Sequence, residues 1–117
     1  MAQHKVKFER SLELENGSVL RSPEVTYDTY GKINHDKSNV VWVCHALTAN
    51  SYVFDWWKGL FGESDLFNPN DYYIVCANVL GSAYGTSSPL SINPETNSPY
   101  FHNFPRFSIR DIVQLHR

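Results

Sequence analysis

The chain has 117 residues, of which 42% are hydrophobic, 19% are charged and 15% are aromatic, and its formal net charge is −2. This composition is typical of one ordered globular domain and excludes a disordered chain or a strongly basic nucleic-acid-binding protein. No apolar run reaches the roughly 18 residues of a membrane span, and the N-terminus lacks the apolar segment of a signal peptide. We therefore expect a cytoplasmic protein with no membrane or nucleic-acid partner.

The first 39 residues have the pattern of antiparallel β-structure. Apolar and polar residues alternate over residues 5–14, which indicates a half-buried strand or strand pair. Asn16-Gly17 predicts a tight turn, and residues 19–30 resume an extended pattern in which Pro23 limits pairing. Residues 31–39 are polar and predict a loop.

The pattern then changes to continuous apolar runs at residues 40–44 and 72–77. Such runs predict strands buried on both faces, as in parallel sheets covered by helices. Apolar residues between the two runs lie at helical spacing and predict a helix over residues 53–61 that stops at Gly62. Cys44 and Cys76 lie inside the runs, so we expect two small buried side chains and no metal site.

Residues 81–107 are rich in Gly, Ser, Pro and Asn, and a loop of this length in a compact domain is usually functional. Ser108 and Asp111 have the Ser-x-x-Asp spacing that starts a helix. Two buried strands, each followed by a helix, predict a βαβα unit with parallel strands. The predicted fold class is α/β: an antiparallel β opening, then this unit, in a three-layer α/β/α arrangement.

The last predicted helix reaches Arg117 without a capping residue. Two parallel strands alone would leave apolar edges exposed. We therefore expect residues 1–117 to be part of a larger domain. The alternative is a small self-sufficient α/β domain.

Six short motifs resemble those of the homoserine O-acetyltransferase family and occur along the chain in the same order as in that family. The most informative is Cys-His-Ala-Leu-Thr-Ala at residues 44–49, which is similar to the family's Cys-His-Ala-Leu-Thr-Gly and follows a predicted strand. The other five are Tyr-Gly-Lys-Ile-Asn at 30–34, Trp-Trp-Lys-Gly-Leu at 56–60, Asn-Val-Leu-Gly at 78–81, the loop segments 85–89 and 91–94, and Phe-Pro with Ile-Arg-Asp at 104–105 and 109–111.

The resemblance implies an α/β-hydrolase fold and a Ser-His-Asp acyl-enzyme mechanism. An acetyl group would pass from acetyl-CoA, a substrate and not a resident cofactor, to the L-homoserine hydroxyl in methionine biosynthesis. The family also implies a homodimer. The chain contains no Gly-x-Ser-x-Gly, and the order Ser, Asp, His of this fold places the triad beyond Arg117. We therefore expect a partial domain, residues 1–117, truncated before the nucleophile elbow and inactive alone.

The resemblance assigns one catalytic group to this chain, the backbone N–H of Leu47, which would donate to the oxyanion. It assigns substrate contacts to four neighbours, Ala46, Thr48, Ala49 and Asn50. The family has Gly at position 49, so Ala49 adds a methyl group beside the acyl pocket. His45 invites a catalytic role, but its place at a strand end predicts a histidine that braces the loop by bonding to backbone. The acyl donor of the reaction could be acetyl-CoA or succinyl-CoA.

Two other functions fit parts of the sequence. An α/β-hydrolase esterase or lipase would share the fold and the oxyanion loop. A nucleotide-binding module would use the Gly-rich segment from Gly81 to Gly85, but the chain has neither Gly-x-Gly-x-x-Gly nor Gly-Lys-Ser/Thr.

Overall fold

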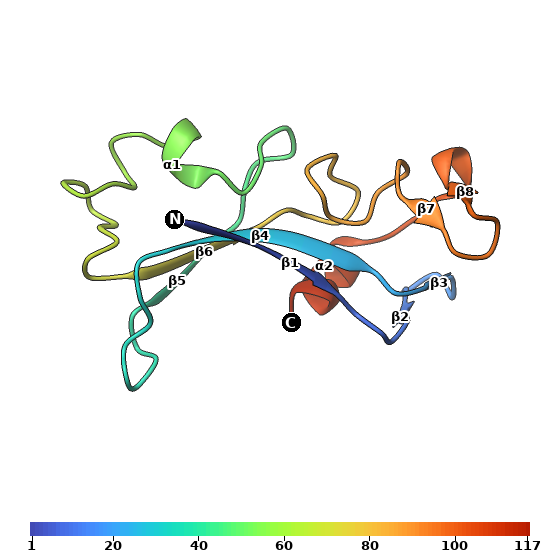
Figure 1. Cartoon of the computed structure of the whole chain (residues 1–117), viewed down its shortest axis with the longest axis horizontal. Coiled ribbons are helices and arrows are strands. Elements are labelled where there is room, and N and C mark those ends of the chain that lie inside the picture. The colour runs from blue at the N-terminus through green and yellow to red at the C-terminus, as the bar shows by residue number, and fades with distance from the viewer. The chain divides into compact units, whose positions relative to one another are not determined.

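The computed structural model describes residues 1–117 and contains eight strands, two α-helices and one 3-10 helix (Figure 1). The chain divides into two compact units. The first comprises residues 1–4 and 26–77, and the second comprises residues 5–25 and 78–117. Neither helix has the length and apolar character needed to cross a lipid bilayer.

A four-stranded mixed sheet has the order β1 (Ala2–Lys7), β4 (Glu24–Tyr30), β6 (Tyr73–Ala77) and β5 (Val40–Val43). β4 pairs antiparallel with β6 and places Asp28 opposite Cys76, whereas β5 pairs parallel with β6 and places Val43 opposite the same cysteine. The predicted change from antiparallel to parallel pairing is therefore confirmed. A parallel pair needs a crossover connection, and here it passes through α1 (Val53–Trp56).

The two apolar runs differ in how far they are buried. Residues 74–77 of β6 are buried, as predicted for a central strand. In β5, Val40 and Trp42 remain 44% and 47% exposed, and the next residue after the strand, Cys44, is also exposed. The predictions that β5 is buried on both faces and that Cys44 is buried are therefore wrong. β5 is the end strand of the sheet, with a neighbour on one side only.

The helix predicted over residues 53–61 is also wrong beyond its first turn. α1 has four residues, and Gly59 adopts a φ of +91°, which a helix cannot contain. The aromatic residues of this segment instead pack through turns. Tyr30 stacks on Phe54 at 4.0 Å between ring centroids, and Phe61 stacks on Phe67 at 4.9 Å. The helical spacing therefore reflects side chains that share one core without sharing one helix.

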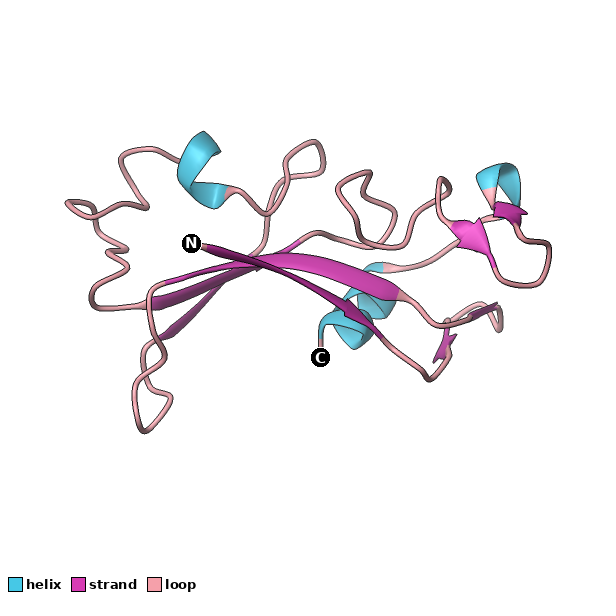
Figure 2. Ribbon diagram, in the orientation of Figure 1, coloured by secondary structure: helices cyan, strands magenta, loops and turns pink.

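The second unit is mostly loop (Figure 2). Its short elements are two hairpins, a 3-10 helix and a final helix: β2 (Leu12–Glu13), β3 (Val19–Leu20), β7 (Ile92–Asn93), β8 (Ser98–Pro99), η1 (Phe101–Asn103) and α2 (Ile109–His116). The predicted turn at Asn16-Gly17 is confirmed. Gly17 has a φ of +87°, which glycine reaches without a steric penalty, and it joins β2 to β3.

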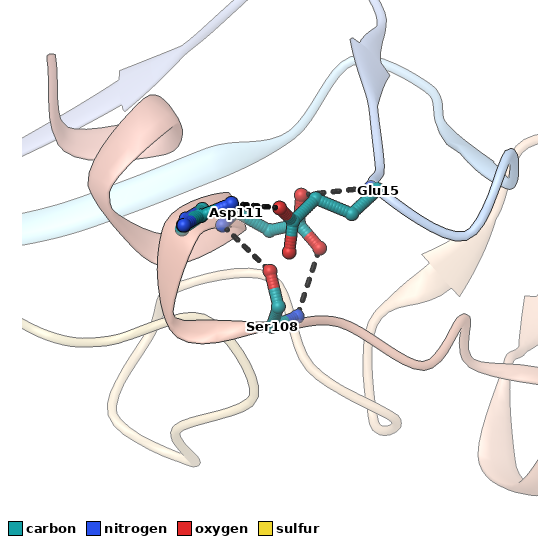
Figure 3. Close-up of polar contacts among 4 residues, drawn as sticks. Glu15, Ser108 and Asp111 are labelled. Atoms are coloured by element: carbon teal, nitrogen blue, oxygen red, sulfur yellow. Dashed lines mark hydrogen bonds and ion pairs between the residues drawn. The ribbon is translucent and has the colours of Figure 1, made fainter.

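The predicted start of α2 is confirmed as a complete capping box. The Ser108 hydroxyl accepts a hydrogen bond from the Asp111 N–H at 3.2 Å, and the Asp111 carboxylate accepts one from the Ser108 N–H at 2.8 Å. The second carboxylate oxygen accepts the Glu15 N–H at 3.0 Å (Figure 3). Asp111 is 2% exposed, so this one side chain ties the helix start to the β2–β3 hairpin.

Candidate functional site

The segment that follows β5, residues 44–51, is an irregular loop within the first unit. It contains all five residues that the sequence assigns to the site. Ala46, Leu47 and Thr48 are exposed, and Ala49 and Asn50 are half-buried. The loop leaves the C-terminal end of a strand in a parallel pair, which is where ligands bind in open α/β sheets.

Residues 46–49 form one tight turn, closed by a hydrogen bond from the Ala49 N–H to the Ala46 carbonyl at 2.9 Å. Leu47 is the second residue of this turn, and its side chain is 92% exposed. No group of the chain accepts a hydrogen bond from the Leu47 amide. The amide is therefore held in a defined turn with its N–H free to donate to a ligand.

His45 braces the turn from within the protein. Its side chain is buried, and Nδ1 lies 2.7 Å from the Ala46 carbonyl oxygen. Because a carbonyl oxygen only accepts, Nδ1 carries the proton in this contact. The Ala46 carbonyl thus receives two hydrogen bonds, one from the turn and one from the imidazole. The prediction that His45 bonds to backbone is confirmed.

The other end of the loop is fixed through Asn50. Its side-chain oxygen accepts the Tyr52 N–H at 2.9 Å, and its backbone carbonyl accepts the Trp56 indole N–H at 3.0 Å. The Cys76 thiol of β6 lies 4.0 Å from the same carbonyl. These contacts join the loop to α1 and to the central strand.

Ser51 connects the loop to the sheet. Its hydroxyl donates to the Asp28 carboxylate in β4, and both residues are fully buried. The other Asp28 oxygen has no hydrogen-bond partner. Hydrogen bonds to charged groups are stronger than hydrogen bonds between neutral groups. The unpartnered carboxylate oxygen can therefore accept a strong hydrogen bond from any donor that comes close to it.

The groups around Asp28 stay neutral at physiological pH. Burial, reinforced by the nearby Asp28 charge and then by Cys44, raises the pKa of the Cys76 thiol to about 12. Burial and then Asp28 also raise the pKa of the Tyr30 phenol. The base of the loop therefore contains one carboxyl group flanked by groups that do not ionise, so Cys76 is not a nucleophile here.

The sequence did not indicate Asp28 or Ser51. The only available signal was a polar residue in the middle of the 24–30 strand pattern, and polar residues in strands usually face solvent. The Asp28–Ser51 pair forms only because β4 and the loop after β5 meet in three dimensions, 23 residues apart. No three His, Cys, Asp or Glu side chains converge on a common point in the structure.

No protein-family model matches the chain, but individual proteins do. A homoserine O-acetyltransferase of Cyclobacterium marinum is 44% identical over 113 residues, which are 97% of this chain and 32% of that protein. A homoserine O-acetyltransferase of Chlorobaculum tepidum is 49% identical over 106 residues, or 91% of this chain and 30% of that protein. The chain thus spans about a third of the length of the curated relatives it matches.

Solved structures share the fold. A homoserine O-acetyltransferase from Bacillus anthracis superposes with a TM-score of 0.86 at 28% identity over 98% of this chain and 35% of that structure. Esterase E22 superposes with the same TM-score of 0.86 at 24% identity, also over 98% of this chain and 35% of that structure, which shows the fold alone. The chain is therefore similar over most of its length to about a third of these homoserine O-acetyltransferases, and its fold is that of the corresponding part of an α/β-hydrolase.

Proposed function

We propose that these residues serve in a homoserine O-acetyltransferase that moves an acetyl group from acetyl-CoA to the hydroxyl of L-homoserine, a step of methionine biosynthesis. The observation that carries the proposal is the Leu47 amide, held free to donate in a braced turn after a parallel strand. The identity of 44–49% to two proteins of that name supports the choice of reaction. We also propose that this enzyme is a homodimer and is located in the cytoplasm.

In this mechanism a serine attacks the thioester carbonyl of acetyl-CoA, and the carbonyl oxygen becomes an oxyanion. The Leu47 N–H donates a hydrogen bond to that oxyanion, where one such donor contributes about 3 kcal/mol to the transition state. Coenzyme A leaves, and the homoserine hydroxyl then attacks the acyl-enzyme through a second oxyanion at the same donor. Ala46, Thr48, Ala49 and Asn50 contact the substrates beside it.

The 117 residues contain no Gly-x-Ser-x-Gly, so a test of the proposal must supply the nucleophile from a relative. The chain assayed alone is expected to show no acyl transfer. The test therefore uses a chimera in which these residues replace the matching third of the Chlorobaculum tepidum relative, which is 49% identical. The unmodified relative is the reference.

The decisive variant is Leu47→Pro, because proline lacks the N–H but suits the second position of a tight turn. Leu47→Ala is the matched control, since it keeps the N–H and removes only an exposed side chain. We expect Leu47→Pro to lower kcat/KM for homoserine acetylation by about 100-fold to 1000-fold and Leu47→Ala to change it little. Equal activity of both variants would exclude the amide as a donor.

A second candidate function is ester hydrolysis, which the likeness to esterase E22 favours at the level of fold. The same chimera discriminates the two reactions when it is supplied with acetyl-CoA and homoserine or with a simple acetyl ester in water. Acetylated homoserine as the main product supports the transferase. Hydrolysis of the ester without transfer supports the esterase, and Leu47→Pro should impair either reaction.

A further inference from the structure

The second unit contains a hollow of about 610 Å³, a size typical of small-molecule sites. Its walls come from the end of β1, from the segment between β3 and β4, and from residues 83–100 of the long loop. None of residues 44–51 lines it. The long loop, which the sequence marks as functional, therefore lines a hollow that shares no residue with the loop proposed for acyl transfer.

Three serine hydroxyls in this wall each accept one hydrogen bond from a backbone N–H. Ser87 accepts the Glu24 N–H at 2.8 Å, Ser88 accepts the Leu90 N–H at 3.2 Å, and Ser91 accepts the Ser88 N–H at 3.0 Å. A hydroxyl has one O–H to donate, and none of the three donates to a group of the chain. The loop thus orients three hydroxyls whose hydrogens remain for a ligand.

Three cationic side chains and one carboxylate line the same hollow, in a chain whose overall charge is negative. Lys5 pairs with that carboxylate, Glu24, at 3.0 Å. Arg21 pairs through its Nε with Glu95 at 3.0 Å, which leaves both terminal nitrogens of the guanidinium to donate. Lys7 has no ion-pair partner. Cationic side chains therefore outnumber carboxylates among the residues that line the hollow.

We propose that this hollow binds a small molecule that bears a phosphate group. Lys7, Arg21 and the hydroxyls of Ser87, Ser88 and Ser91 bind the phosphate oxygens. A group with several oxygens matches donors that are spread over two walls, and a guanidinium with hydroxyl donors is a common phosphate-binding combination. Leu90 and Ile92 are exposed and line the same hollow, so they supply an apolar wall for the organic part of the ligand.

The mode of binding differs from that of the nucleotide-binding loops that the sequence lacks. In those loops, backbone N–H groups at the start of a helix bind the phosphate. Here side chains supply the donors. No α-helix begins at the hollow, and the three-residue 3-10 helix η1 that starts after the lining residue Tyr100 is too short to form such a site. A metal cation is disfavoured because the cationic side chains outnumber the single carboxylate, which is already paired.

The test is a titration of the full chain, followed by the backbone amide NMR signals of Ser87, Ser88, Leu90 and Ser91. The probes are inorganic phosphate, glycerol 3-phosphate and glycerol. We expect saturable shifts with both phosphates, none with glycerol, and weaker binding as salt is raised, since screening weakens charge pairing. Tighter binding of glycerol 3-phosphate than of phosphate identifies the ester as the preferred source. Equal binding identifies the phosphate group alone as the determinant.

Charge-removing variants locate the site. Lys7→Gln combined with Arg21→Gln should weaken phosphate binding by about tenfold or more, because two charged contacts are lost. Lys58→Gln removes one charge from an exposed lysine of the first unit and should leave affinity unchanged. Both altered residues of the double variant are exposed, so we expect the variant to fold. The titrations of the unmodified chain with the three probes and at several salt concentrations test the proposal separately. Undiminished binding by the double variant, equal weakening by Lys58→Gln, or shifts with glycerol overturns the proposal.

Discussion

Removal of the Asp111 side chain should destabilise the second unit more than any change to the exposed face of α2. Asp111→Ala removes one hydrogen bond to the Ser108 N–H at 2.8 Å and one to the Glu15 N–H at 3.0 Å. Hydrogen bonds to charged groups contribute about 1.5–3 kcal/mol each, but contributions within one network do not add. Both bonds are part-buried, so water replaces the lost carboxylate only in part at the Ser108 N–H and at the Glu15 N–H. We expect a net loss of about 2–4 kcal/mol.

Two companion variants separate the parts of this value. Ser108→Ala removes only the hydroxyl that caps the Asp111 N–H, and such a loss typically costs about 1 kcal/mol. Arg110→Ala removes a neighbouring ion pair with Glu15, whose arginine is 87% exposed, and should cost less than about 0.5 kcal/mol. The expected order of destabilisation is therefore Asp111→Ala, Ser108→Ala and Arg110→Ala.

The assay is urea unfolding of the chain, which gives the free energy of unfolding when the slope with denaturant is unchanged. Amide exchange at Glu15 supplies a local reading, because that N–H loses its acceptor only in the Asp111 variant. Faster exchange at Glu15 should accompany the loss of stability. If Asp111→Ala destabilises no more than Arg110→Ala, the reasoning from the buried carboxylate is refuted.

Three further predictions concern the first unit. Gly31→Ala should lower the free energy of unfolding in urea by several kcal/mol, because Gly31 has a φ of +80° and an added Cβ would overlap backbone oxygens. Gly17→Ala is the control: Gly17 has a similar φ but lies in open space, so its substitution should cost about 1 kcal/mol. Ser51→Ala should speed amide exchange at Ala49, because the loop loses its bond to Asp28, while the Gly17 turn is unaffected; unchanged exchange would contradict the anchor. A thiol reagent at pH 8 should label Cys44 rapidly and Cys76 only on unfolding. The contribution of the neutral Cys76 thiol to the free energy of unfolding should be present below pH 9 and should fall between pH 9 and pH 12. If Cys76→Ala loses as much stability over that pH range as the unmodified chain, the thiol is not the cause.

Local signals in the sequence predicted local structure correctly. Ser108 and Asp111 stand three residues apart and form the capping box they predict, because both partners belong to one helical turn. Asn16 and Gly17 likewise form the predicted turn. The apolar run of β6 lies in the middle of the sheet, where pairing on both sides agrees with burial on both faces.

Predictions failed where the result depended on neighbours distant in the chain. The apolar run of β5 looks like that of β6, yet β5 is the end strand, so Trp42 and Cys44 stay exposed. The residues from Trp57 to Phe61 have helical spacing, yet the aromatic core is filled by turns around Gly59. In both cases one sequence pattern is compatible with two environments, and only packing distinguishes them.

The sequence by itself determined the extended structure of the first 30 residues, the positions of β5 and β6, the turn at Asn16-Gly17, the cap of α2 and the resemblance that assigns a role to Leu47. These features depend on neighbouring residues or on motifs in a row. Tertiary structure alone decided that Asp28 anchors the loop through Ser51, and that Lys7, Arg21 and the 87–91 serines line one hollow. The physical reason is that hydrogen bonds and charges act through space at a few ångströms, whereas these groups are separated by 14 to 84 positions in the chain.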